Sequence, residues 1–117
     1  MKTKIETVTL YRPTGPEELK LVEESGYTRW PPRLPEQPIF YPVTNESYAK
    51  EIAIDWNIKA SGVGYVTKFL VTKEFMDNYS IEQVGDSHHT EWWIPAEKLE
   101  ELNDNIVGLI EVIGKYQ

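Results

Sequence analysis

The chain has 117 residues, 40% of them hydrophobic and 26% charged, which is the size and composition of one globular domain and excludes disorder as the main state. Lys and Arg number 12 against 19 Asp and Glu, and the net charge of -7 argues against general nucleic-acid binding and against anionic lipid as a partner. Cysteine is absent, which excludes disulfides and thiolate chemistry and favours a cytoplasmic location.

We expect neither an export signal nor a membrane-spanning segment in this sequence. Residues 1–6 include two lysines, but no apolar stretch follows them, so we expect no secretory signal. The longest apolar run, residues 106–110, is interrupted by Gly108 and is far shorter than the roughly 20 residues that a membrane-spanning helix needs. We therefore expect no membrane association.

The first elements are a strand and a helix. Residues 7–11 alternate polar and apolar β-formers, which predicts a strand with one buried face. The Pro13 to Pro16 segment is expected to end this strand, and Pro16 is well placed as the first residue of a helix. Gly26 follows where a left-handed residue is expected to end that helix.

Residues 27–42 differ from the rest of the chain, because they hold five prolines, several aromatic residues and a single acid. Prolines restrict the unfolded chain, so we expect an ordered loop. Arg29 and Arg33 make this loop a cationic and aromatic region in an acidic protein. Trp30 and Arg33 could hold the base and phosphate of a nucleotide, or Trp30 could fill the core beneath the loop. The loop is also a candidate contact surface for a protein partner.

The remaining elements predict an α+β domain, a single compact domain of residues 1–117 with about six short, mostly antiparallel strands and two or three helices. Thr44 or Asn45 is expected to cap a helix with its apolar side chains on one face. The other expected elements are strands at 39–43, 65–72, 80–84, 88–94 and 107–113, a turn-rich link at 59–64, a helical turn at 73–78 and a helix after Pro95.

Four dispersed residues are candidates for a functional site. Arg12 follows the first strand, Tyr41 and Thr44 lie at the end of the second, and Glu91 lies in the 88–94 strand. Trp92 and Trp93 indicate that this last strand is buried on both faces, where an ionised Glu91 needs a partner. We expect Arg12 to be that partner. Arginine and glutamate are also common surface residues, so each position alone is a weak signal.

Three segments carry a family resemblance that covers nearly the whole chain: Leu10–Pro13, Pro31–Val43 and Glu91–Glu97. With these segments the chain resembles a small family of bacterial and phage proteins labelled "ADP-ribosylation/crystallin J1". The order of its elements is also similar to that of an ADP-ribosyltransferase domain, in which residues from three strands surround NAD.

The resemblance implies a role for each matching residue. Arg12 would contact a phosphate or ribose, Tyr41 would lie against the nicotinamide ring, and Glu91 would be catalytic, stabilising the oxocarbenium-like state as nicotinamide leaves. The chain departs from the transferase pattern at two places. It has Tyr41-Pro42-Val43-Thr44 instead of a Ser-Thr-Ser run, and His89 stands where many transferases carry Glu or Gln.

The His88-His89 pair invites a metal interpretation, but adjacent residues on a strand point to opposite faces, so we expect no metal site. Only His89 shares a face with Glu91. His89 could therefore contact the same ligand as Glu91, or it could donate a hydrogen bond to a loop carbonyl.

Three functions remain open after these observations. The first is binding of NAD or an ADP-ribose-like nucleotide in a cleft, with ADP-ribosyl transfer or NAD glycohydrolysis as its enzymatic form. The second is a module that binds or sequesters a nucleotide without catalysis. The third is a protein-interaction domain that uses the proline-rich loop. Function belongs to the site rather than the fold, so the positions of the candidate residues have to decide.

Overall fold

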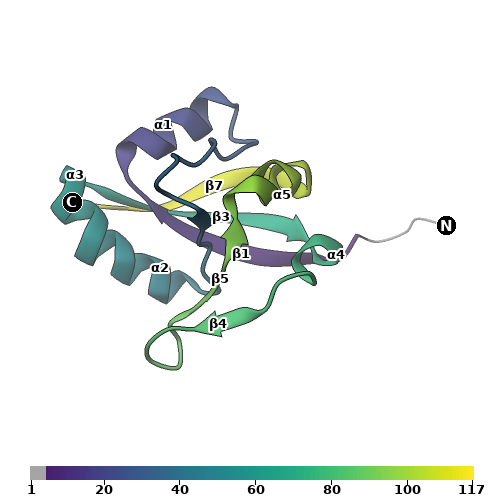
Figure 1. Ribbon diagram of the computed structural model, residues 1–117. Helices are drawn as coiled ribbons and strands as arrows, with labels where there is room; N and C mark the ends of the chain where they lie inside the picture. Colours follow the sequence, from purple (N-terminus) through teal and green to yellow (C-terminus); the bar gives the residue numbers. More distant parts are fainter. Residues whose placement is uncertain (1–4) are drawn as a thin grey trace.

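The computed structural model describes residues 5–117, which form an α+β domain with antiparallel strands, as the sequence predicts (Figure 1). Most of the N-terminal segment that we expect to lack an export signal lies outside these residues. No helix of residues 5–117 has the length and apolar character needed to cross a lipid bilayer.

The centre of the domain is an antiparallel sheet in the order β1-β3-β7. Its strands are β1 (Thr7–Thr14), β3 (Gly64–Thr72) and β7 (Ile106–Tyr116). β1 pairs with β3 without a register shift, from Thr7 opposite Thr72 to Thr14 opposite Tyr65. Alternate side chains of a strand point to opposite faces, so this sheet is covered on both sides.

The larger core lies on one face of the sheet, beneath α1 (Pro16–Glu24), α5 (Leu99–Asp104) and the proline-rich loop (Figure 1). Leu10 of β1, Phe69 of β3 and Ile110 of β7 contribute to it. The smaller core lies beneath α2 (Glu46–Ile52), a π-helix (Ala53–Asn57) and α3 (Ile58–Ser61). These three helices follow one another without a break.

Four short strands form two further two-stranded sheets. β2 (Ile39–Phe40) pairs with β6 (Ile94–Pro95), and β4 (Ile81–Gln83) pairs with β5 (Thr90–Trp92). Val43 forms antiparallel bridges to Tyr11 of β1 and to Glu91 of β5. The chain segment around Val43 therefore joins the hairpin of β4 and β5 to the central sheet.

Two helix ends agree with the sequence. The Asn45 side chain accepts a hydrogen bond from the backbone N–H of Tyr48 at 2.7 Å and so caps α2. Gly26 follows α1 with a φ of 78°, the left-handed conformation expected there. The helical turn expected at 73–78 is α4 (Lys73–Met76).

Three expected boundaries are wrong. β1 continues through Pro13 to Thr14. The Tyr11 N–H points away from β3 and donates to Val43, and the N–H position of Pro13, two residues later, lies on that same side. The missing N–H of Pro13 therefore removes no hydrogen bond to β3. The turn-rich link expected at 59–64 is shorter than predicted. The helix continues to Ser61, and Gly62 ends it with a φ of 82°.

The third error concerns residues 88–94, which do not form one strand buried on both faces. Residues 85–89 form a turn, β5 begins at Thr90, and Trp93 is 46% exposed between β5 and β6. The many β-forming residues at 88–94 predict a strand, but the first two of them belong to the turn in which the chain reverses direction.

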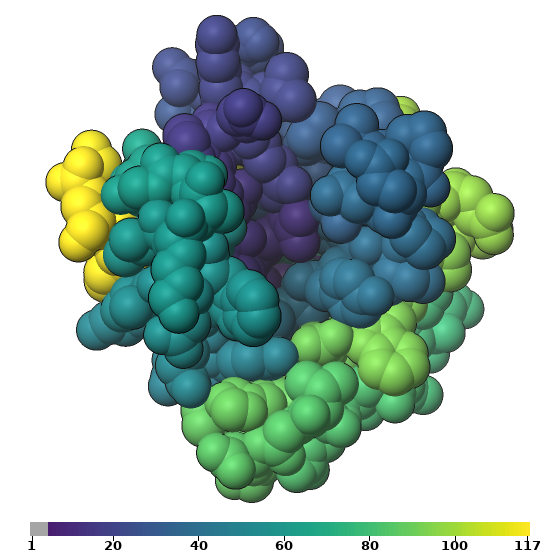
Figure 2. Space-filling model, turned by 60° about the vertical axis from the view of Figure 1, so that its left-hand side comes forward, coloured from purple at the N-terminus to yellow at the C-terminus, as the bar shows by residue number. Residues whose placement is uncertain are grey.

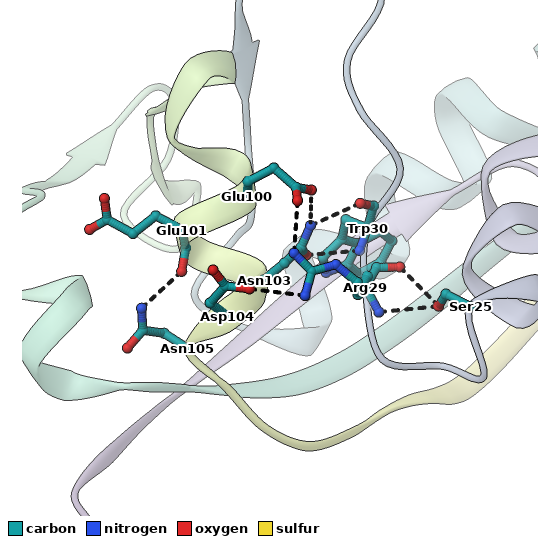
Figure 3. Close-up of polar contacts among 8 residues, drawn as sticks. All are labelled: Ser25, Arg29, Trp30, Glu100, Glu101, Asn103, Asp104 and Asn105. Atoms are coloured by element: carbon teal, nitrogen blue, oxygen red, sulfur yellow. Dashed lines mark hydrogen bonds and ion pairs between the residues drawn. The ribbon is translucent and has the colours of Figure 1, made fainter.

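Trp30 fills the larger core and is 1% exposed, so its expected role in ligand binding is wrong. Its ring packs against Phe40 and Phe69. Figure 3 shows how α5 holds the backbone beneath it: the Asn103 side chain accepts the Trp30 N–H at 2.8 Å and donates to the Trp30 carbonyl at 3.0 Å. Arg29 points outward to Glu100 and Asp104.

Replacing Asn103 with alanine tests this anchor. We expect Asn103→Ala to lower the free energy of unfolding by about 1–3 kcal/mol, because the buried N–H and carbonyl of Trp30 lose their partners. Arg29→Ala, which removes only exposed ion pairs, is the control and should cost less than about 1 kcal/mol. Urea denaturation measures both values, and equal losses would contradict the anchor.

Candidate functional site

A cavity of about 310 Å³ lies where β1, the segment before Val43, β5 and the α2–α3 helices meet. Its lining residues come from all four: Arg12, Pro13, Tyr41, Ile52, Asn57 and Glu91. Figure 2 shows the hollow, with purple residues of β1 at its base, the teal helical segment on one side and the blue proline-rich loop on the other. Three of the predicted site residues, Arg12, Tyr41 and Glu91, are therefore brought together.

The backbone explains this meeting of distant residues. Tyr11 and Val43 exchange two hydrogen bonds of 2.9 and 2.7 Å, and the Trp92 N–H donates to the Pro42 carbonyl at 2.9 Å. Each predicted residue is next to one of these bonded positions in the sequence. The sheet extension through Val43 thus fixes Arg12, Tyr41 and Glu91 around one space.

Arg12 is held by Glu18, in the first turn of α1, and not by Glu91 as we expected. Its Nε and Nη2 donate to the two Glu18 carboxylate oxygens at 2.6 and 2.8 Å, and its guanidinium lies 4.4 Å from the centre of the Phe40 ring. Such a two-point pair fixes the guanidinium plane. Glu18 is nearer in sequence and lies at the positive end of a helix, which favours a carboxylate there.

Arg33 approaches the same carboxylate, with 3.6 Å between its Nη1 and Glu18 Oε1. Burial and the neighbouring charge of Arg12 lower the pKa of Arg33, because two cations face one anion. Among residues 5–117, the buried Nε of Arg33 has no hydrogen-bond partner. This group of Arg12, Glu18 and Arg33, the guanidinium cluster, keeps one positive charge unbalanced beside the cavity.

The pKa of Glu18 reflects its burial and its interactions with Arg12 and Thr14. Burial tends to raise it, but the charge of Arg12 and the hydrogen bonds from Arg12 and Thr14 together hold the pKa below its ordinary value of 4.5. Glu18 is therefore ionised at neutral pH and serves as the counterion of both arginines.

Glu91 is buried, 8% exposed, and both of its oxygens accept a hydrogen bond. Tyr48 Oη on α2 donates to Oε1 at 3.0 Å, and Trp93 Nε1 donates to Oε2 at 2.7 Å. Burial and the bond to Glu91 raise the pKa of Tyr48 to about 12, so this phenol remains a donor. Two neutral donors thus replace the arginine that we expected beside Glu91.

Tyr41 and Asn57 complete the polar and aromatic lining. Tyr41 is 43% exposed, so its ring is open to a ligand. In the described part of the chain, the buried Oδ1 of Asn57 has no hydrogen-bond partner. An acceptor of this kind is costly to leave unpaired, and the residue that carries it lines the cavity.

Thr44 and His89 do not line this cavity, although we expected both to bind the ligand. The Thr44 hydroxyl bonds to that of Thr90 and helps to join the segment after Val43 to β5. His89 lies in the turn before β5 rather than on the strand, so it does not share a strand face with Glu91. It faces α2 instead.

The same turn overturns our reason for excluding a metal. Because His88 and His89 are not on a strand, their rings need not diverge, and the Nε2 atoms of both approach Glu51 of α2. Nδ1 of His89 accepts the Asp86 N–H at 3.1 Å, whereas the sequence suggested a bond to a loop carbonyl.

Sequence reasoning missed four contributors to these arrangements: Glu18, Tyr48, Glu51 and Asn57. In the sequence, the position of Glu18 in the first turn of a helix is explained by the positive helix end alone, and Tyr48 is explained as part of the apolar face of the next helix. The spacing of Tyr48, Glu51 and Asp55 places them on one helical side, which was the available signal. No pattern in the sequence indicated which loop would face that side.

Comparison of the chain with protein-family models, with curated proteins and with solved structures found no match in any of the three. The arrangement of the described residues is therefore the basis for a functional proposal.

The guanidinium cluster makes a prediction about acid stability. The folded-state pKa of Glu18 is lowered, so its contribution to stability is present above pH 4.5 and is lost as the pH falls toward the folded-state value. Glu18→Gln should cost about 3 kcal/mol or more at pH 7, because it leaves two partly buried arginines without their counterion. The variant should also lose less stability than the wild type between about pH 6 and pH 3.

Glu17→Gln is the matched control, since it removes the same charge from the same helical turn at an exposed position. Urea denaturation across the pH range compares the three proteins. The same pH dependence in Glu18→Gln and the wild type would contradict the role given to Glu18.

Proposed function

We propose that this protein binds a ribose-bearing nucleotide, such as NAD or ADP-ribose, with part of the ligand in the cavity. The observation that carries the proposal is the meeting of an open aromatic ring, the guanidinium of Arg12 and a buried carboxylate around one space of about 310 Å³. Arg33 does not line this space, but it adds a positive charge next to Arg12 through their shared partner Glu18. These groups match a base or nicotinamide ring, a phosphate and a ribose.

Each lining residue has a part in this proposal. The ring of Tyr41 offers a surface for stacking. The guanidinium cluster attracts a phosphate, although Glu18 already occupies two donors of Arg12. Glu91 can accept a ribose hydroxyl, because each carboxylate oxygen has a further lone pair. The volume is near the lower end for ligand pockets, so the rest of a dinucleotide would lie outside.

The hydrogen bonds of Glu91 favour binding over covalent catalysis. Tyr48 and Trp93 hold both carboxylate oxygens, which restrains Glu91 and lowers its value as a nucleophile. A restrained carboxylate can still stabilise positive charge on a ribose as nicotinamide leaves. NAD glycohydrolysis or ADP-ribosyl transfer is therefore an extension of the proposal, and a non-catalytic nucleotide-binding module is its simpler form.

The proline-rich loop offers less to a protein partner than its composition indicates. Trp30 and Phe40 are each 1% exposed and belong to the larger core. Leu34, at 56% exposed, and Tyr41, at 43%, are the large hydrophobic residues that the loop presents to solvent. A cytoplasmic nucleotide-binding protein agrees with the absence of cysteine and with the acidic net charge.

Isothermal titration calorimetry with NAD and with ADP-ribose tests the proposal. We expect Tyr41→Ala and Glu91→Gln each to weaken binding about tenfold or more, through loss of stacking and of a charge-assisted hydrogen bond. Glu97→Gln removes an exposed charge near the same strand and should bind as the wild type does. Chromatography of each mixture then shows whether the ligand is converted.

Absence of binding to either nucleotide would overturn the proposal, as would equal binding by all three variants. Recovery of intact ligand after binding would assign the simpler, non-catalytic form. Conversion that Glu91→Gln abolishes would assign the enzymatic form.

A further inference from the structure

Two imidazoles and a carboxylate converge on the side of α2 that faces the turn at residues 85–89. Nε2 of His88 lies 2.5 Å from Glu51 Oε2, and Nε2 of His89 lies 3.2 Å from Glu51 Oε1. The candidate ligand atoms all lie within 4.8 Å of one another. Hydrogen bonds from His88 and His89 lower the pKa of Glu51, so the carboxylate is ionised at neutral pH.

The backbone holds this cluster in place. The Asn45 side chain that caps α2 also donates from its Nδ2 to the His88 carbonyl at 2.7 Å. The Asn45 side chain thus attaches the turn, which contains both histidines, to α2, which contains Glu51. The ring of Tyr48 packs beside that of His89, with 4.7 Å between ring centres, and limits its rotation.

Room for a further ligand lies directly beside the cluster. A small cavity of about 110 Å³ is lined by Glu51, Asp55 and His89, together with Tyr48, Ile52 and Trp56. Asp55 belongs to the π-helix, a rare conformation that is frequent at functional sites. Asp55 lines the same cavity as Glu51, which precedes it by four residues in the chain.

We propose that Glu51, His88 and His89 bind a divalent transition-metal cation of the Zn²⁺ class, with water or Asp55 completing the coordination. Two imidazole nitrogens and one carboxylate oxygen suit Zn²⁺ and Co²⁺, whereas Mg²⁺ and Ca²⁺ prefer sites made of oxygen ligands alone. Such a cation replaces the protons that now join the three side chains, and it clamps the turn to α2. The site lies next to the cavity that holds Glu91, since Ile52 lines both, but its proposal does not depend on the proposed function.

The proton on His89 adds a specific consequence. Its Nδ1 accepts the Asp86 N–H at 3.1 Å, so the neutral ring carries its proton on Nε2. A neutral ring that ligates through Nε2 carries its proton on Nδ1, so the Asp86 N–H then loses its acceptor. We therefore expect metal binding to shift the backbone amide resonance of Asp86.

Calorimetric titration of the full chain with Zn²⁺ tests the site, and titration with Co²⁺ gives an independent optical signature. We expect binding of one ion per chain, d–d absorption from a low-symmetry Co²⁺ site, and a rise in the melting temperature with Zn²⁺ but not with Mg²⁺. His88→Ala and Glu51→Gln should each weaken Zn²⁺ binding by at least about tenfold.

Glu46→Gln is the matched control, because it removes an exposed carboxylate from the same helix outside the cluster. Circular dichroism verifies that each variant is folded, and the Co²⁺ spectrum of the wild type needs no variant. Absence of Zn²⁺ binding by the wild type would overturn the proposal. Equal Zn²⁺ affinity in Glu46→Gln, His88→Ala and Glu51→Gln would overturn it as well.

Discussion

The pair of backbone hydrogen bonds between Tyr11 and Val43 is the contact on which both candidate sites depend. It attaches the segment after the proline-rich loop to β1, and Val43 in turn bridges to Glu91 of β5. Tyr11, Val43 and Glu91 thus form a row across the sheet. The cavity lined by Arg12, Tyr41 and Glu91 opens beside this row. Helix α2 begins three residues after Val43 and carries Tyr48 and Glu51 to the β5 side.

The guanidinium cluster and the Glu91 group illustrate two ways of keeping charge in a small domain. Glu18 neutralises arginines that also rest on aromatic rings of the larger core. Glu91 instead relies on neutral donors, which satisfy its oxygens without cancelling its charge. The cavity consequently has the paired guanidinium of Arg12 and the carboxylate of Glu91, which has no cationic partner, in its lining.

Sequence reasoning succeeded where the signal was local and failed where it depended on long-range packing. Strand alternation, the Asn45 cap and the left-handed Gly26 are set by neighbouring residues, and they were predicted correctly. The pairing of Arg12 was predicted wrongly, because Glu91 and Glu18 are equally acidic in the sequence and only the path of α1 decides between them. His88 and His89 were assigned to a strand for the same reason. The sequence indicates a turn at residues 85–87, but its extension through the two histidines becomes evident only when it is seen bonded to α2.

Trp93 differs from the other tryptophans in a way that matters for experiments. Trp30 and Trp92 are buried and Trp56 is the most exposed, whereas Trp93 is half exposed and donates its indole N–H to Glu91. An indole that is bonded to a buried carboxylate at one edge and exposed to solvent at another reports on the environment of that carboxylate. The protein therefore carries a built-in fluorophore at the rim of its cavity, and a chain in which the other tryptophans are replaced by phenylalanine would allow occupancy to be followed by light emission alone.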